Sequence, residues 1–232
     1  MQILGIDGCR GGWIGIRYSL EALDWSFSAV LEDLLSSPMP TQAFIDMPIG
    51  LSSQGPRQCD RAARQMLGRK FSSSVFPTPA RLALDGKDYP EANALNRQQS
   101  GSGLSKQSYY LLPKIYEVDR WLRNRSDPAE LLRESHPEVA FHAINGASLC
   151  HKKKTAEGFQ ERLKLLSDLD DRVPALAENI LAATLRRNIA ADDILDACCL
   201  AIMPLAGRFQ TLPENPEKDD EGLKMEICFY GA

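Results

Sequence analysis

The N-terminal part of the chain constrains the fold most, because short apolar runs alternate there with tight turns. Residues 3–7 predict a buried strand, the glycine-rich stretch 8–12 a turn, and residues 13–18 a second strand. Residues 25–30 alternate between apolar and polar side chains and predict a third strand. Strands joined by such short connections favour an antiparallel meander.

The chain past this meander predicts two more strands among helices. Residues 32–35 predict a short helix, and residues 43–46 predict a buried fourth strand. Residues 131–134 favour a fifth strand, and the alternative is the end of a helix that begins at Asp127. Pro137 occupies a favourable first helical position and opens a further helix.

The remaining sequence is mostly helical by its apolar spacing, and Pro113 is expected to kink or split the helix that contains it. The predicted helices cover residues 56–67, 107–123, 155–169, 174–187 and 191–205. Residues 210–222 read as a polar linker, and residues 223–230 as a last edge strand. The predicted class is therefore α/β, with a mixed five-stranded sheet of three antiparallel and then parallel strands, flanked by helices.

The length of 232 residues suits a single domain over residues 1–232, with residues 47–125 as a helical or loop insertion, or a cap, within it. A composition of 44% hydrophobic and 25% charged residues is typical of a globular protein and excludes disordered and fibrous classes. No apolar run reaches the roughly 18 residues of a membrane helix. Six cysteines without a C-x-x-C pair, and no export signal, indicate reduced thiols and a cytoplasmic location.

The net charge of −4 conceals an uneven distribution along the chain. Residues 57–165 contain 19 Lys and Arg against 12 Asp and Glu, and acidic segments lie on both sides. One interpretation is a solvated surface on which both signs are mixed. The other is a basic face near an acidic cluster, which suits a polyanion bound through metal.

Two aspartates, Asp7 and Asp46, end predicted buried strands. A single aspartate in such a place is usually a turn former. If the two strands are parallel neighbours, however, both carboxylates emerge at the same edge of the sheet. Like charges so close together are costly. Mg²⁺ or Mn²⁺ would offset that cost, because both ions prefer carboxylate oxygens.

A third acidic element lies in residues 191–203, which read ADDILDACCLAIM. Asp193 and Asp196 are three residues apart and therefore share one face of a helix. Capping explains Asp192, and the helix dipole helps to explain Asp193. Neither explains Asp196, which lies one turn inside a strongly apolar helix, so we expect Asp196 to be functional.

Glu134 and His136 are further candidates next to the fifth strand. Glu134 is a candidate extra metal ligand or a residue that orients an attacking water, and His136 is a candidate proton shuttle. The alternative is ordinary helix-entry chemistry around Pro137.

Several cations are candidates for binding a phosphate. Lys106 follows the flexible stretch 101–103, and Arg10 lies in the first turn. A predicted helical row contains Arg57, Arg61 and Arg64, and residues 152–154 are three consecutive lysines. Such runs are often only solvated; if functional, they contact nucleic-acid backbone rather than read sequence.

Eight motifs carry a resemblance to a known family. They are GIDGCRGGW, IDMPIGL, RQCDRAARQMLG, VFPTP, LSKQ, PKIYEVD, ESHPEVAF and DDILDA. These motifs lie between residues 5 and 197, and the resemblance covers about residues 4–206, nearly the whole chain. Together they resemble the predicted RNase H-like nuclease family, a family of unknown function. The DDILDA helix is most similar to that of junction resolvases in the RNase H-like superfamily.

The resemblance implies a nuclease that hydrolyses phosphodiester bonds with two divalent cations, Mg²⁺ or Mn²⁺. Asp7 would bridge both ions, Asp46 and Asp196 would each hold one, and Asp193 would assist. The implied partner is DNA, RNA or a nucleotide. A homodimer is left open, because junction-cutting relatives act as dimers.

Two alternatives remain. The first is phosphoryl transfer of the actin-like ATPase class, with which the hairpin GIDGCRGG is compatible. That class usually has two such domains, and this sequence shows neither a second glycine-rich hairpin nor a P-loop. The second alternative is a non-catalytic nucleic-acid-binding protein, against which Asp196 argues.

Overall fold

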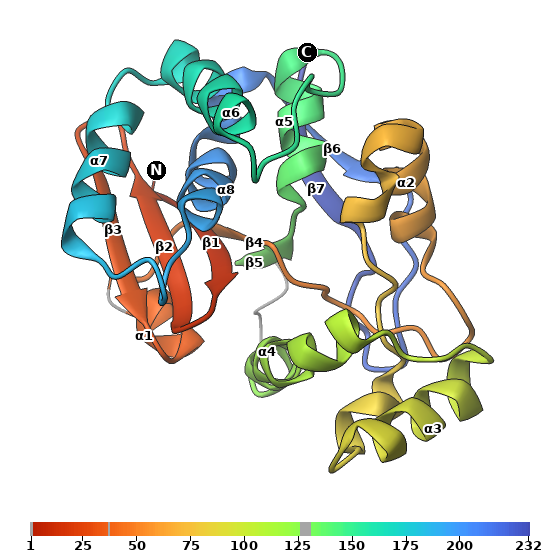
Figure 1. Cartoon of the computed structure of the whole chain (residues 1–232). Helices are drawn as coiled ribbons and strands as arrows, with labels where there is room; N and C mark the ends of the chain where they lie inside the picture. Colours follow the sequence, from red (N-terminus) through yellow and green to blue (C-terminus); the bar gives the residue numbers. More distant parts are fainter. Residues whose placement is uncertain (1, 37, 126–130) are drawn as a thin grey trace. The chain divides into compact units, whose positions relative to one another are not determined.

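A five-stranded mixed sheet organises the part of the fold that carries the candidate acids (Figure 1). The computed structural model describes residues 2–36, 38–125 and 131–232. The strands are β1 Ile3–Cys9, β2 Gly12–Tyr18, β3 Leu23–Ser28, β4 Gln42–Ile45 and β5 Leu132–Glu134. Their order is β3-β2-β1-β4-β5, with β1, β2 and β3 antiparallel and β1, β4 and β5 parallel. The predicted mixed sheet and the α/β class are confirmed.

The chain divides into two units. The first, here called the sheet unit, comprises Met1–Asp46, Glu130–Gln210 and Cys228–Ala232; the second, the helical unit, comprises Met47–Ala129 and Thr211–Ile227. The predicted insertion therefore falls in the helical unit. Residues 132–134 form strand β5, as predicted, and not the end of a helix, which was the alternative. Asp127, where that alternative helix would begin, lies outside the described residues.

The connection between β1 and β2 is tighter than predicted. Cys9 pairs with Gly12, so the turn consists only of Arg10 and Gly11, and Asp7 lies within β1 rather than at its end. Gly12 has a φ of 149°, and a Cβ atom there would overlap the carbonyl oxygen of Ser28. Only glycine fits at this close approach of backbones.

Helix α8 is the central helix of the sheet unit. It packs across β1, β2 and β4, and α5, α6 and α7 pack against it. The helices of this unit are α1 Leu31–Ser36, α5 Pro137–Asn145, α6 Ala156–Leu169, α7 Val173–Ala183 and α8 Ala191–Ile202. Residues 194–202 of α8 are all buried, as the apolar sequence predicts.

Gly5 allows α8 to lie directly on β1. A Cβ atom at Gly5 would overlap the carbonyl oxygen of Ala197 and the amide nitrogen of Ala201, both in the backbone of α8. The helix and the strand therefore approach each other without an intervening side chain, and the facing helix residues are also small. This contact fixes the position of α8 along β1.

Three helices form most of the helical unit: α2 Gln58–Phe71, α3 Tyr89–Ser100 and α4 Lys106–Arg123. Pro113 was expected to kink or split its helix. It does not split the helix, because α4 is continuous through Pro113. Pro113 is exposed on α4. Loss of one backbone hydrogen bond is tolerated there because the long helix is anchored by buried residues on both sides of Pro113.

Residues 211–227 are part of the helical unit rather than a linker. Asp219 is buried and accepts hydrogen bonds from the backbone nitrogens of Leu51 and Leu223, each at 2.9 Å. Arg81 pairs with Asp219 at 2.5 Å and with Asp119 at 2.8 Å. The predicted polar linker is therefore held by a buried carboxylate.

Two short strands at the end of the chain form a second sheet, β6 Arg208–Leu212 and β7 Ile227–Gly231. The last strand, predicted over residues 223–230, is present as β7 but begins later, at Ile227. The first residues of the predicted linker belong to β6. An isolated parallel bridge also joins Ser135 to Cys228, next to β5.

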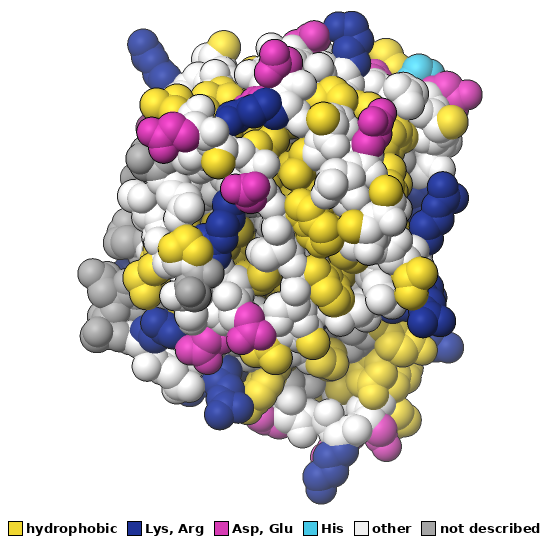
Figure 2. Space-filling view, turned by 90° about the vertical axis from the view of Figure 1, so that its left-hand side faces the viewer, with side chains coloured by type: hydrophobic (Ala, Val, Ile, Leu, Met, Phe, Trp, Pro, Cys, Tyr) yellow, Lys and Arg dark blue, Asp and Glu magenta, His cyan; other side chains and the backbone are white. Residues whose placement is uncertain are grey.

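The surface drawn in Figure 2 shows Lys, Arg, Asp and Glu side chains interspersed, with hydrophobic side chains between them. This face agrees with the interpretation of mixed surface charges rather than a single basic face. Among the described residues, none of the helices combines the length and apolarity needed to cross a bilayer.

The contact at Gly5 generates a prediction about stability. Gly5→Ala should lower the free energy of unfolding by about 3 kcal/mol or more, because the new methyl group meets backbone that cannot move aside. Gly103→Ala is the control: its Cβ would meet only the ends of the Arg97 and Asn93 side chains. Urea denaturation of both variants measures the difference. A Gly5→Ala variant as stable as Gly103→Ala would contradict the close packing.

Candidate functional site

Asp7 and Asp46 lie side by side at the carboxyl edge of the parallel strands. Ile6 of β1 pairs with Ile45 of β4, and the backbone nitrogen of Asp46 donates to the carbonyl oxygen of Ile6 at 3.0 Å. The condition set from the sequence is met, because β1 and β4 are parallel neighbours, although Asp7 lies within β1 and only Asp46 follows its strand. Asp7 is buried, and its carboxylate accepts a hydrogen bond from the backbone nitrogen of Gly8 at 2.7 Å.

Helix α8 adds two more carboxylates at the same edge. Asp196 is 1% exposed, and the charges of Asp196 and Asp193 both act on Asp7. Asp193 also accepts a hydrogen bond from the backbone nitrogen of Ala190 at 2.8 Å, so it caps the start of α8. We call Asp7, Asp46, Asp193 and Asp196 the acidic cluster.

The acidic cluster is electrostatically unfavourable when fully ionised. Burial, and then the charges of Asp46, Asp196 and Asp193, hold the pKa of Asp7 well above its ordinary value. Burial is also the main cause that raises the pKa of Asp46 to about 7 and that of Asp193 to about 6. At neutral pH these groups therefore bind more protons than free aspartates, and a cation nearby would stabilise their ionised forms.

Lys153 supplies a cation to the acidic cluster. Its Nζ atom donates to Asp196 at 2.6 Å and lies 3.9 Å from a carboxylate oxygen of Asp192. Burial opposes the charge of Lys153, but Asp196, Asp7 and Asp46 outweigh it, so the net effect is a raised pKa. Lys153 therefore stays protonated in the site.

Sequence reasoning missed this role of Lys153. It treated residues 152–154 as one cluster, although Lys152 and Lys154 are exposed and only Lys153 turns inward. The sequence alone does not show which of three consecutive lysines points into the protein. Its selection depends on how the chain enters α6.

The turn before α6 is held by two side chains of that helix. Glu161 accepts hydrogen bonds from the backbone nitrogens of residues 150–151, at 2.6 and 2.8 Å. The buried Arg162 donates to a backbone carbonyl of the same turn at 3.1 Å and to Glu138 at 2.6 Å. These contacts position the segment that carries Lys153, and Glu138 also raises the pKa of Asp46.

Glu134, predicted as a catalytic residue, lies on the other face of the sheet. Glu134 pairs with Ile45, which pairs with Ile6, so these three side chains point to the same face. Gly5, one residue earlier in β1, faces α8, and alternation therefore places Asp7 with α8 and Glu134 on the opposite face. Glu134 is buried, and the register places its side chain on the face of the sheet opposite α8.

Two predicted substrate-binding residues belong to the sheet unit. Arg10 is exposed in the turn between β1 and β2, where Gly11 donates a hydrogen bond to the carbonyl oxygen of Asn188 at 3.1 Å. Arg10 thus lies at the same edge of the sheet as Asp7 and remains a candidate. His136 is the N-cap residue of α5, and its half-buried side chain does not cap the helix.

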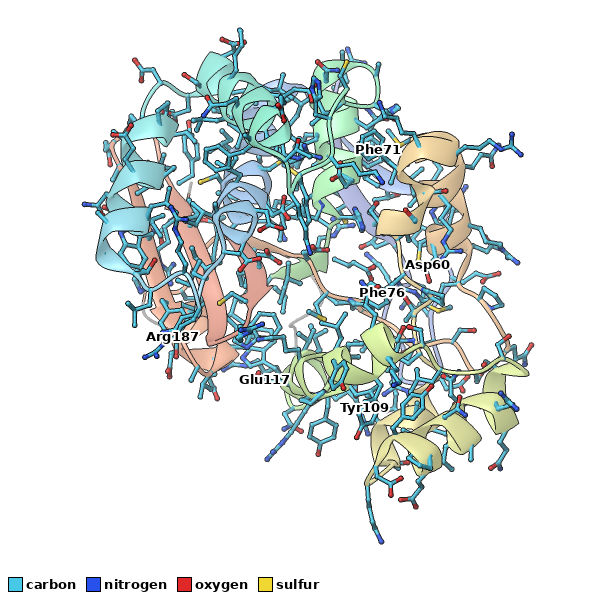
Figure 3. All side chains as sticks on the ribbon, viewed as in Figure 1. Asp60, Phe71, Phe76, Tyr109, Glu117 and Arg187 are labelled. Atoms are coloured by element: carbon cyan, nitrogen blue, oxygen red, sulfur yellow. The ribbon has the colours of Figure 1, made fainter. Side chains whose placement is uncertain are left out.

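Arg57, predicted as a substrate-binding residue in a helical row, is buried. It is 3% exposed and donates to the carbonyl oxygen of Ile49 at 2.9 Å and, at 2.6 Å, to Asp60 of α2, which is labelled in Figure 3. It therefore stabilises the helical unit instead of presenting a charge to a substrate. Arg61 and Lys106 are exposed in the same unit and remain candidates for binding.

The acidic cluster offers oxygen donors of the kind that a hard divalent cation prefers. Within residues 2–36, 38–125 and 131–232, no group of three or more His, Cys, Asp or Glu side chains is arranged to hold a metal ion. The donors nevertheless fit a hard divalent cation in kind, because Asp7, Asp46 and Asp196 offer only carboxylate oxygens. In the arrangement described, the ammonium group of Lys153 contacts Asp196.

The fold and the acidic cluster define an α/β protein with convergent buried carboxylates at one sheet edge. Residues 5–218 match the family described as "Protein of unknown function (DUF429)", and the chain belongs to that family. No curated protein and no solved structure matches the chain.

Lys153 generates the second prediction. With a chelator present at about pH 8, Lys153→Met should lower the free energy of unfolding by about 1–3 kcal/mol, less than a fully buried ion pair because Lys153 is partly exposed. At about pH 5 the loss should be smaller. Asp46 and Asp193, whose pKa values are raised to about 7 and about 6, are then largely neutral.

The control for Lys153→Met is Lys152→Met, because Lys152 is exposed and precedes it directly. Urea denaturation of both variants at the two pH values measures the effect, and the control should stay within about 0.5 kcal/mol of wild type. Equal stabilities of the two variants at both pH values would show that Lys153 does not neutralise the acidic cluster.

Proposed function

We propose that this protein is a phosphodiester hydrolase, a nuclease, that uses Mg²⁺ or Mn²⁺ at the acidic cluster. One observation carries the proposal: carboxylates from β1, from the end of β4 and from α8 act on one another at a single edge of the sheet. Convergent, electrostatically strained acids are typical of sites that bind cations and react with phosphate.

We also propose that the fold is RNase H-like. The strand order β3-β2-β1-β4-β5, with antiparallel strands followed by parallel ones, supports this proposal. An acid in the first strand, a second acid after the fourth, and acids early in the last helix of the sheet unit are the arrangement that the resemblance implies.

A purely structural role explains the acidic cluster poorly. Asp196 is almost completely buried in an otherwise apolar helix, where an alanine or leucine would cost less. Asp193 is different, because capping accounts for part of its position. The proposed role therefore depends mainly on Asp7, Asp46 and Asp196.

In the proposed mechanism, Asp7, Asp46 and Asp196 would hold the cations, and Asp193 would assist. Divalent cations bound there would polarise the phosphoryl group and lower the pKa of a bound water. The strand backbone keeps Asp7 rigid, and the contact at Gly5 keeps Asp196 beside it. Preorganised carboxylates of this kind lose little entropy when the substrate binds.

Lys153 and Arg10 have distinct proposed roles. Lys153, whose ammonium group contacts Asp196, would contact the scissile phosphate and stabilise the negative charge that develops on it if cations took its place on the carboxylates. Arg10, exposed at the same sheet edge, would bind a neighbouring phosphate. Glu138, Arg162 and Glu161 act indirectly, because they position the turn that leads to Lys153.

The proposed substrate is a nucleic acid. Within the helical unit, residues 47–129 contain 13 Lys and Arg against 7 Asp and Glu, and residues 211–227 contain 2 against 6, so the excess of positive charge that favours a polyanion belongs to the first segment. A cytoplasmic location remains part of the proposal, and the six cysteines, all among the described residues, form no disulfide, which suits a reducing compartment.

The proposal is tested by incubating wild type with Mg²⁺ or Mn²⁺ and with single-stranded and duplex DNA, RNA, and ATP. Wild type should cleave a nucleic acid. Asp7→Asn and Asp196→Asn should each slow cleavage by about 100-fold or more, because even residues that only orient metal ligands typically cost 10–100-fold.

Asp168→Asn is the matched control, because Asp168 is an exposed aspartate of α6 paired with Lys164. Cleavage by this variant should equal that of wild type. Failure of wild type to cleave any nucleic acid with either metal would refute the proposal, and hydrolysis of ATP alone would favour the phosphotransferase alternative.

A further inference from the structure

One face of α4 presents aromatic rings between positive charges. Its exposed residues Lys106, Tyr110, Pro113, Tyr116 and Arg120 follow one another at intervals of three or four, so they share one side of the helix. Tyr110 is 74% exposed and Tyr116 is 49% exposed. Single exposed aromatic residues are common on protein surfaces, but an exposed series on one helix face is not.

The same tyrosines line a groove in the helical unit. The groove has a volume of about 510 Å³, and Leu84, Gly86, Lys87, Tyr109, Tyr110, Leu112, Pro113 and Tyr116 line it. This volume lies in the range of roughly 300–1,000 Å³ that is typical of small-molecule pockets. Among its described lining residues, Lys87 is the one charged side chain, so the groove combines flat apolar walls with a positive charge.

The rings are held in place by one another. Tyr109 projects from α4 (Figure 3) and packs edge-to-face against Tyr89 of α3, with ring centroids 5.3 Å apart. The ring of Tyr110 packs against that of Tyr109 in a tilted arrangement, with centroids 5.7 Å apart. The hydroxyl group of Tyr89 donates a hydrogen bond to the carbonyl oxygen of Leu104. Tyr110 therefore forms a supported platform, and ordering it on binding costs little entropy.

We propose that this face of α4 and its groove bind single-stranded nucleic acid. Bases stack on Tyr110 and Tyr116, and backbone phosphates contact Lys87, Lys106 and Arg120. The inference rests on the proposed function, whose substrate it narrows to an unpaired strand, but the surface itself is independent of the acidic cluster. We call it the stacking face.

Charge and ring geometry favour a nucleic acid over a protein partner. Cations at both ends of an aromatic series match a chain that alternates phosphates with flat bases. Paired bases hide their faces inside the duplex, so the stacking face selects single strands. It recognises no sequence, because every base has a face that can stack.

The test measures fluorescence anisotropy of labelled oligothymidylate and oligouridylate of about 20 nucleotides, and of a duplex of equal length. All measurements contain a chelator, so cleavage does not interfere. Wild type should bind both single strands more tightly than the duplex, and the affinity should fall as salt rises. The DNA and RNA arms show whether the sugar matters.

Paired variants separate stacking from folding. Tyr110→Ala with Tyr116→Ala should weaken single-strand binding at least about tenfold. Tyr110→Phe with Tyr116→Phe keeps the rings and should stay within about twofold of wild type, since stacking needs no hydroxyl. Lys87→Glu should also weaken binding, whereas Lys164→Glu, an exposed charge change on α6, should not.

The proposal is overturned if wild type binds no single strand, if the duplex binds as tightly, or if the double alanine variant binds like wild type. Asp168→Asn, an exposed change outside the stacking face, should bind single strands as wild type does. If wild type binds single strands but cleaves no nucleic acid, the proposed function is refuted and the stacking face stands. If wild type cleaves but the tyrosine changes leave single-strand binding unaffected, the stacking face is refuted and the proposed function stands.

Discussion

The direct contact between α8 and β1 at Gly5 is the constraint on which the sheet unit and its acidic cluster depend. A side chain at Gly5 would overlap the backbone of α8 at Ala197 and Ala201. Because the helix lies this close, its second turn brings Asp196 to the edge where Asp7 lies within β1. The same contact therefore determines both the packing of α8 and the geometry of the site. Burial of the apolar residues of α8 stabilises the helix in a position where its carboxylates repel Asp7.

Bound protons and the charge of Lys153 both reduce the repulsion between these carboxylates. Burial raises the pKa values of Asp7 and Asp46, so the acidic cluster holds protons that free aspartates would release. Lys153 offsets part of the remaining negative charge through Asp196, and a buried pair, Glu138 and Arg162, helps to hold the turn before it. Charged groups so arranged contribute little net stability, and for this reason we propose that they bind a cation.

The sequence was enough to predict the sheet, because strand periodicity and glycine turns are local properties. The proximity of Asp7 and Asp46 was expected if their strands were parallel neighbours, Asp196 was singled out by its place in an apolar helix, and the family resemblance implied that the three share one site. Glu134 was expected at the same sheet edge as Asp46, but the sequence did not show its face: one step of register moves a side chain to the other side of the sheet, and the pairing with Ile45 places Glu134 opposite α8. Lys153 was missed because neighbouring lysines are equivalent in sequence, and only tertiary contacts of the preceding turn distinguish them.

The most direct test of the acidic cluster is calorimetric titration of Mn²⁺ into wild type, Asp7→Asn, Asp196→Asn and the exposed control Asp168→Asn. Because Asp7 and Asp196 would share one cation site, substitution of either residue should abolish Mn²⁺ binding. We expect wild type and Asp168→Asn to bind the metal and both cluster variants to lose binding. Absence of binding to wild type, or binding that neither cluster substitution weakens, would contradict the account and leave the carboxylates with a structural role.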